Sequence, residues 1–98
     1  MTEVRDVLAD RDGKYGKFAD VADLAQDLKT SIRDGRIIGG ELRAGDGRKV
    51  IRADMLEALD MICSKIARIV NGDPTYVDNW IDIAGYATLV ANRLEGKT

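Results

Sequence analysis

The apolar residues between positions 54 and 94 form two helical runs, and this pattern constrains the fold more than any other feature of the chain. Within each run they recur three and four residues apart, which is typical of an amphipathic α-helix. The first run consists of Leu56, Leu59, Ile62, Cys63, Ile66, Ile69 and Val70, and the second of Val77, Trp80, Ile81, Ala84, Ala87, Val90, Ala91 and Leu94. Because only a few residues separate the runs, they predict two antiparallel helices, at about 55–71 and 76–95.

The ends of these two helices carry residues typical of caps. The spacing of a capping box occurs twice, at Asp54 with Glu57 and at Thr75 with Asp78. We expect Gly72 to end the first helix in the left-handed conformation, and Pro74 prevents the helix from continuing.

The N-terminal third of the chain predicts two more helices, at about 2–11 and 19–34. The second of these helices has an apolar side formed by Val21, Leu24, Ala25, Leu28 and Ile32. Gly35 follows it and should end the helix. Between the helices, Tyr15-Gly16-Lys17-Phe18 reads as a turn whose two aromatic rings fold onto the body of the protein.

The segment 36–53 is basic and rich in Gly. Ile37-Ile38 and Val50-Ile51 flank an Asp46-Gly47 pair, which predicts a short β-hairpin near 36–52. Its arginines and lysine allow two interpretations, a solvated connection or an anion-binding flap that includes Arg43 and Arg48.

Ninety-eight residues with 45% hydrophobic content suit one domain, so we predict an all-α fold over 1–98, a small helical bundle built on the C-terminal hairpin. A core of this size is thin, and a second apolar side at Ile83, Tyr86 and Val90 favours a homo-oligomer. A net charge of −2 argues against nucleic acid as a partner, and no apolar run is long enough to span a membrane. The single Cys63 lies on an apolar side without any His in the chain, which fits a reduced cytoplasmic thiol.

Charged residues form two short rows on the C-terminal hairpin. Lys65 and Arg68 lie one turn apart on the first helix, while Asp78 and Asp82 lie one turn apart on the second, with Tyr86 continuing that row. The rows could be structural ion pairs, with Lys65 and Arg68 bound to Asp78 and Asp82, or they could be part of a binding site.

The motif K-x-x-R-x-x-N-G-x-P-x-x-x-D-x-W-x-D-I-A-G-Y-A from Lys65 to Ala87, preceded by Tyr15-Gly16-x-Phe18, resembles a family of small proteins encoded by tailed bacteriophages and prophages. The resemblance covers most of the chain and implies a phage protein made in the bacterial cytoplasm. The segment 36–53 departs from it, because a shorter and less basic connection is expected there.

A more distant similarity is to the all-α nucleotide pyrophosphohydrolases of the MazG and dimeric dUTPase type. Those enzymes hold magnesium with Glu-x-x-Glu on one helix and Glu-x-x-Asp on the next, and several carboxylates must converge on the cation. Glu57 and Asp60 could stand for the first pair and Asp82 for the end of the second, but Asn79 occupies the position of the other acid.

Three functions therefore remain open. The first is a non-catalytic oligomer that binds a phosphorylated nucleotide or nucleotide-derived signal, as a phage counter-defence protein that sequesters a host signal would. Its binding residues would be Lys65, Arg68, Asp78, Trp80, Asp82, Tyr86, Tyr15, Arg43 and Arg48, and it would need no cofactor. The second is a magnesium-dependent nucleoside triphosphate pyrophosphohydrolase that uses Glu57, Asp60, Asp78 and Asp82. The third is an adaptor that binds another protein.

Overall fold

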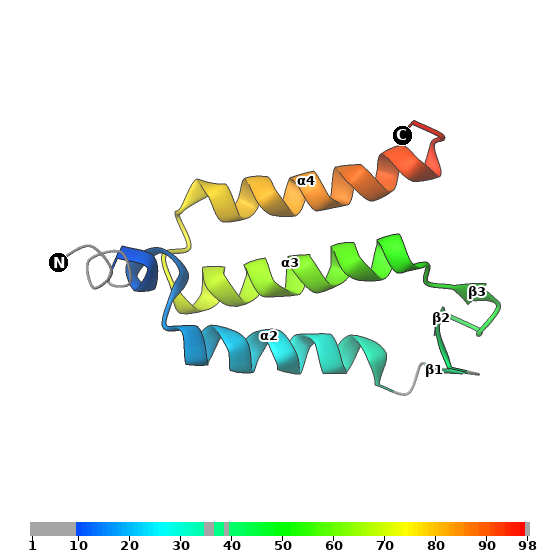
Figure 1. Cartoon of the computed structure of the whole chain (residues 1–98), viewed down its shortest axis with the longest axis horizontal. Coiled ribbons are helices and arrows are strands. Elements are labelled where there is room, and N and C mark those ends of the chain that lie inside the picture. Colours follow the sequence, from blue (N-terminus) through cyan, green and yellow to red (C-terminus); the bar gives the residue numbers. More distant parts are fainter. Residues whose placement is uncertain (1–9, 35–36, 39, 98) are drawn as a thin grey trace, which may run out of the picture.

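The computed structural model describes residues 10–34, 37–38 and 40–97, and these form a mainly helical domain (Figure 1). Its helices are α2 (Phe18–Arg33), α3 (Ala53–Asn71) and α4 (Val77–Leu94), and residues 10–15 are also helical. The prediction of an all-α fold is confirmed. Most of the helix predicted at 2–11 lies outside the described residues, and its described part continues across Gly13 to residue 15.

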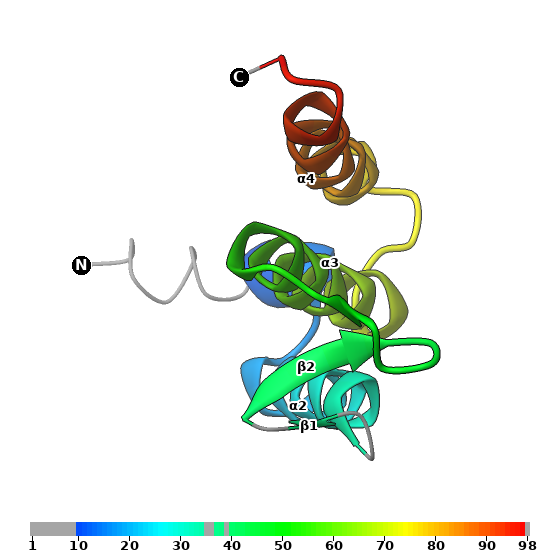
Figure 2. The same cartoon turned by 90° about the vertical axis from the view of Figure 1, so that its right-hand side faces the viewer.

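The three helices lie side by side in one layer with α3 in the middle (Figures 1 and 2). Each is antiparallel to its neighbour, so the C-terminal hairpin of α3 and α4 is present as predicted. The molecule measures 53 × 31 × 24 Å. A single layer gives every helix two open sides, and this explains why so few residues are buried.

Small and polar side chains make up much of the interior. The buried apolar residues are Ala25, Leu42, Ala58, Cys63, Ala67 and Ile69. Lys65 and Asn79 are buried among them, and neither polar atom of the Asn79 side chain has a hydrogen-bond partner in the described part of the chain. Burial raises the pKa of the Cys63 thiol, which fits a packing role for this residue.

Helix α4 contacts α3 through a different side from the one that its predicted apolar run occupies. The least exposed positions of α4 include Asn79, Ile83, Tyr86 and Val90, which follow one another at helical spacing. Trp80, Ile81 and Leu94, which the pattern places inside, are instead 53 to 60% exposed. Helical periodicity identifies apolar sides, but it does not determine which of two sides meets the neighbouring helix.

The predicted capping boxes are wrong. Helix α3 begins at Ala53 and α4 at Val77, and neither N-cap residue makes a side-chain hydrogen bond. Asp54 binds arginine side chains instead, and the Thr75 hydroxyl donates to Asp73 Oδ1 at 2.6 Å. Hydrogen bonds with charged side chains are stronger than those with a backbone amide, so these two side chains do not cap their helices.

The segment before α3 forms three short strands, β1 (Ile37–Ile38), β2 (Glu41–Ala44) and β3 (Lys49–Val50), in the order β1-β2-β3. The expected hairpin around Asp46-Gly47 is present, with Ala44 opposite Lys49. Ile37-Ile38 pairs with β2 rather than with Val50-Ile51. Leu42 is buried beside Ile32 and Leu59, so the ribbon covers one end of α2 and α3.

Candidate ligand-binding groove

A groove of about 670 Å³ lies where residues 10–15, α2 and α3 meet. Its lining combines three cationic residues, one carboxylate, two aromatic rings and a small apolar floor: Arg11, Asp12, Tyr15, Gly16, Phe18, Val21, Ala22, Ala25, Gln26, Lys29, Ser64 and Arg68. This volume lies in the range typical of small-molecule sites.

Two glycines fix the backbone beside this groove. Gly16 has φ +86°, and a Cβ atom added there would lie 2.5 Å from the carbonyl oxygen of Asn71. A Cβ atom on Gly72 would meet the carbonyl oxygen of Lys14, which also accepts a hydrogen bond of 3.0 Å from the Asp73 amide. Gly72 itself has φ −118°, so the prediction of a left-handed cap is wrong there, and the close backbone contact is what requires Gly.

This contact places Tyr15 against the C-terminal half of α3. The guanidinium carbon Cζ of Arg68 lies 5.1 Å from the centre of the Tyr15 ring, and that of Arg11 lies 5.4 Å from it. Both distances fit cation–π contacts. The structure therefore brings together two predicted binding residues, Tyr15 and Arg68, that are far apart in the sequence.

Tyr15 and Tyr76 link the groove to the turn before α4. The two rings meet edge to face, with centres 5.5 Å apart, and Lys14 Nζ lies 5.3 Å from the centre of the Tyr76 ring. The Tyr76 hydroxyl donates to Asp78 Oδ2 at 2.9 Å, and this bond raises the pKa of Tyr76 well above its ordinary value. Asp78 is thus bound to a tyrosine, and no ion pair joins it to Arg68.

The other predicted binding residues on the hairpin lie outside the groove. Lys65 Nζ pairs with Asp82 Oδ2 at 2.9 Å between α3 and α4. Trp80 Nε1 donates to the Pro74 carbonyl at 2.8 Å. Tyr86 and Asp82 line a separate shallow surface of α4 with Gly85.

The predicted anion-binding arginines of the β ribbon have partners within the ribbon. Arg43 contacts Glu41 Oε2 at 2.7 Å and donates to the carbonyl of Gly47, while Arg48 contacts Asp46 Oδ2 at 3.3 Å. These local pairs favour the interpretation of the segment as a connection.

The acidic residues of the enzyme alternative are not gathered in one place. Asp60 Oδ2 contacts the Arg33 guanidinium at 2.7 Å, Asp82 pairs with Lys65, and Glu57 is exposed. Across residues 10–34, 37–38 and 40–97, no group of three or more His, Cys, Asp or Glu residues could hold a metal ion.

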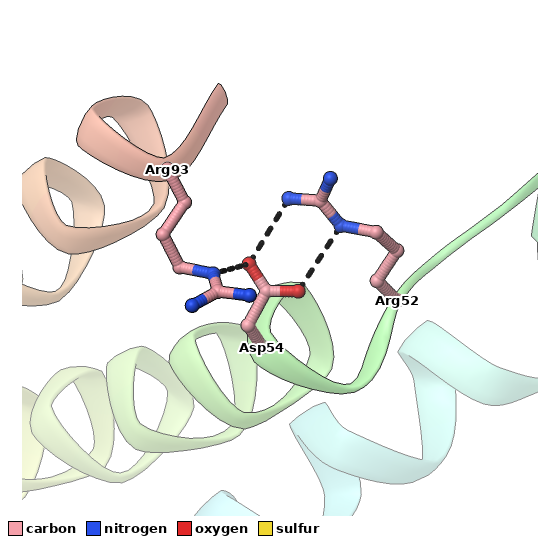
Figure 3. Close-up of polar contacts among 3 residues, drawn as sticks. All are labelled: Arg52, Asp54 and Arg93. Carbon is pink, nitrogen blue, oxygen red and sulfur yellow. Dashed lines mark hydrogen bonds and ion pairs between the residues drawn. The ribbon is translucent and has the colours of Figure 1, made fainter. Parts of the chain in front are cut away.

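A second cluster of charges closes the opposite end of the hairpin (Figure 3). Asp54 Oδ2 accepts from both Arg52 and Arg93 at 3.1 Å, so the start of α3 is joined to the end of α4. The hydrogen bonds from Arg52, with a smaller contribution from the charge of Arg93, lower the pKa of Asp54. Both carboxylate oxygens of Asp54 accept hydrogen bonds from these arginines, so the cluster serves as a structural tie.

Several groove residues were not predicted from the sequence. Arg11, Lys29 and Ser64 lie at ordinary surface positions of their helices and carry no motif. One usable signal was the position of Arg11, which precedes Tyr15 by one helical turn and can therefore reach its ring.

The fold and the groove define a small α-helical domain with a cationic and aromatic groove at one end of an antiparallel helical hairpin. The chain belongs to the family described as "Domain of unknown function (DUF6378)", whose model matches residues 2–94. No curated protein and no solved structure matches the chain. Among the described helices, none is both long and apolar enough to cross a membrane.

Proposed function

We propose that this protein binds a phosphorylated nucleotide or a nucleotide-derived signal in the groove, without catalysis. The observation that carries the proposal is the placement of two guanidinium groups, from Arg11 and Arg68, around the Tyr15 ring. Guanidinium groups hold phosphate oxygens through paired hydrogen bonds, and the exposed Phe18 ring, which lines the same groove, offers a stacking surface for a base.

The ion pairs of the chain support this choice. Arg33, Arg43, Arg48, Arg52 and Arg93 each form a salt bridge with a carboxylate. Among the arginines that the structure describes, Arg11 and Arg68 are the two that form none, and both line the groove. Their hydrogen-bond donors are therefore available to an anionic ligand.

The rest of the groove suits a ligand with both charged and apolar parts. Lys29 adds a third positive charge, and Val21, Ala22 and Ala25 form an apolar floor. Phe18, at the rim, is 80% exposed and could cover a base that enters the groove. A phosphate bound by Arg and Lys needs no bridging metal.

A binding role without turnover also agrees with the distribution of carboxylates. A pyrophosphohydrolase needs several of them around one cation, whereas Asp60 and Asp82 each pair with a separate basic residue. Sequestering a host signal requires only a tight groove, and this is the use that an origin in a bacteriophage would suggest.

The first experiment is to incubate the purified protein with pooled nucleotides and EDTA, remove unbound molecules, and identify the retained ones by mass spectrometry. The proposal expects an intact phosphorylated nucleotide to be retained by the folded protein. Pyrophosphate and a monophosphate formed only when magnesium is added would support the enzyme instead. No retained nucleotide and no product would contradict both functions and favour the adaptor.

A further inference from the structure

A second surface of the molecule is uncharged over the whole length of the helical hairpin. On α3 it is formed by Met55, Leu59, Ile62, Ile66 and Val70, and on α4 by Trp80, Ala84, Ala87, Ala91 and Leu94. Successive members of each row are three or four residues apart, so each row runs along one side of its helix. We call this surface the apolar side.

The two rows lie next to each other. Met55, Leu59 and Ile62 of α3 line one apolar groove of about 370 Å³ together with Ala87, Val90 and Leu94 of α4. The ion pairs that join the helices, Lys65 with Asp82 and Asp54 with Arg93, come from other positions around each helix. One side of the hairpin therefore carries the charges, and the other carries none.

The apolar side is exposed to a degree that is unusual for large apolar residues. Val70, Trp80 and Leu94 are 53 to 66% exposed, while the core contains mostly small residues. The one polar atom of the Trp80 side chain already donates to Pro74, so the remaining ring surface gains nothing from water. Contiguous apolar surface of this kind marks an interaction site.

We propose that the apolar side is the contact between two copies of this chain, whose α3–α4 hairpins pack into a four-helix bundle. Two adjacent antiparallel helices with apolar residues at heptad-like spacing are what each half of such a bundle presents. A second copy offers the same uncharged rows, so no charge is buried without a partner when the two surfaces meet.

The size of the surface agrees with a dimer. The 19 residues of α3 make a helix about 28 Å long, and two neighbouring helices are about 20 Å wide, which gives roughly 560 Å² in flat projection. The relief of the side chains adds to this value, which brings it near the ~800 Å² per partner of a stable interface. The nucleotide groove uses residues 10–15, α2 and other positions of α3, so this inference does not depend on the proposed function.

The test compares two leucines of α4 that are almost equally exposed. Leu94, on the apolar side, is 60% exposed, and Leu89, beside Asp82 and Tyr86, is 61% exposed. Light scattering should give twice the mass of one chain for the full wild-type protein and for Leu89→Glu, and the mass of a single chain for Leu94→Glu. The melting temperature of the wild type should also rise when the protein concentration is raised about twentyfold, because association stabilises the folded state.

Three results would overturn the inference. They are a wild-type protein that stays monomeric and melts at the same temperature at all concentrations, a dimer that Leu94→Glu leaves intact, and a dimer that Leu89→Glu dissociates equally well. Even if a variant fails to fold, the wild-type measurements can still overturn the inference, because a monomer at all concentrations contradicts it.

Discussion

Lys65 and Asp82 form an ion pair that is buried at one end only. The two charged atoms are 2.9 Å apart, but the Lys65 side chain is 11% exposed and the Asp82 side chain 47%. The pair joins α3 to α4 near the fully buried Asn79. Because water reaches the Asp82 side chain much more than the Lys65 side chain, the two partners are not equivalent.

This asymmetry predicts unequal effects of removing each partner. Asp82→Asn leaves a buried ammonium group without its counter-charge and should lower the free energy of unfolding by about 2–3 kcal/mol. Lys65→Met leaves a carboxylate in contact with water and should change it by less than about 1 kcal/mol. Urea unfolding of both variants measures this, and an equal or larger loss for Lys65→Met would contradict it. We expect nucleotide binding to be unchanged in Lys65→Met.

The contact of Gly16 with Asn71 predicts that this glycine cannot be replaced. Gly16→Ala places a methyl group on the backbone of Asn71 in a residue with positive φ, so we expect a loss of at least about 2 kcal/mol and a displaced Tyr15. Gly40→Ala is the matched control, because Gly40 has φ +79° but nothing within 4 Å of an added Cβ atom. The Gly40→Ala variant should lose only about 1 kcal/mol of its free energy of unfolding. Equal losses in thermal or urea unfolding would refute the role of the contact.

The Asn79 amide has no hydrogen-bond partner among the described residues, which predicts that an apolar residue of the same branched shape is tolerated. Burying an amide without partners costs about 1–3 kcal/mol, so Asn79→Leu should raise the free energy of unfolding by about 1 kcal/mol. Asn79→Ala, which leaves a cavity, serves as the comparison. If Asn79→Leu is destabilising, the amide is bound to a polar partner in solution.

The lowered pKa of Asp54 predicts how the tie between α3 and α4 depends on pH. A carboxyl group with a lower pKa in the folded state stabilises the fold above its unfolded pKa, near 3.9, and loses this contribution as the pH falls through the folded pKa. The melting temperature of the wild type should therefore exceed that of Asp54→Asn by a constant amount from pH 5 to 8. The difference should shrink as the pH falls below the unfolded pKa and disappear once the pH lies below the folded pKa of Asp54. A difference that grows on acidification would be inconsistent with this tie.

The sequence predicts the helices better than it predicts their contacts. Periodicity placed α2, α3 and α4 within two residues of their observed ends, because the spacing of apolar residues depends only on local geometry. It could not show that α4 meets α3 through Asn79 and Tyr86, since that helix has apolar residues on two sides.

The same distinction explains the candidate site. Tyr15 and Arg68 were both predicted as binding residues, but the contact that unites them depends on two glycines 56 positions apart, Gly16 and Gly72. The sequence made three other basic residues equally plausible as binding residues, namely Arg43, Arg48 and Lys65. In the structure each of these residues forms an ion pair with a neighbouring carboxylate, of Glu41, Asp46 and Asp82 respectively. The sequence alone does not show these pairs.

Binding of nucleotide by matched arginine variants tests the central claim most directly. Arg68→Gln removes a guanidinium group from the groove, whereas Arg48→Gln removes one that is paired with Asp46 on the surface of the ribbon. Hydrogen bonds to charged groups contribute about 1.5–3 kcal/mol, so in the pooled-nucleotide capture with EDTA we expect Arg68→Gln to retain about 10- to 100-fold less nucleotide at limiting concentration. Arg48→Gln should retain as much as the wild type. Equal retention by both variants, or a greater loss in Arg48→Gln, would contradict the assignment of the groove.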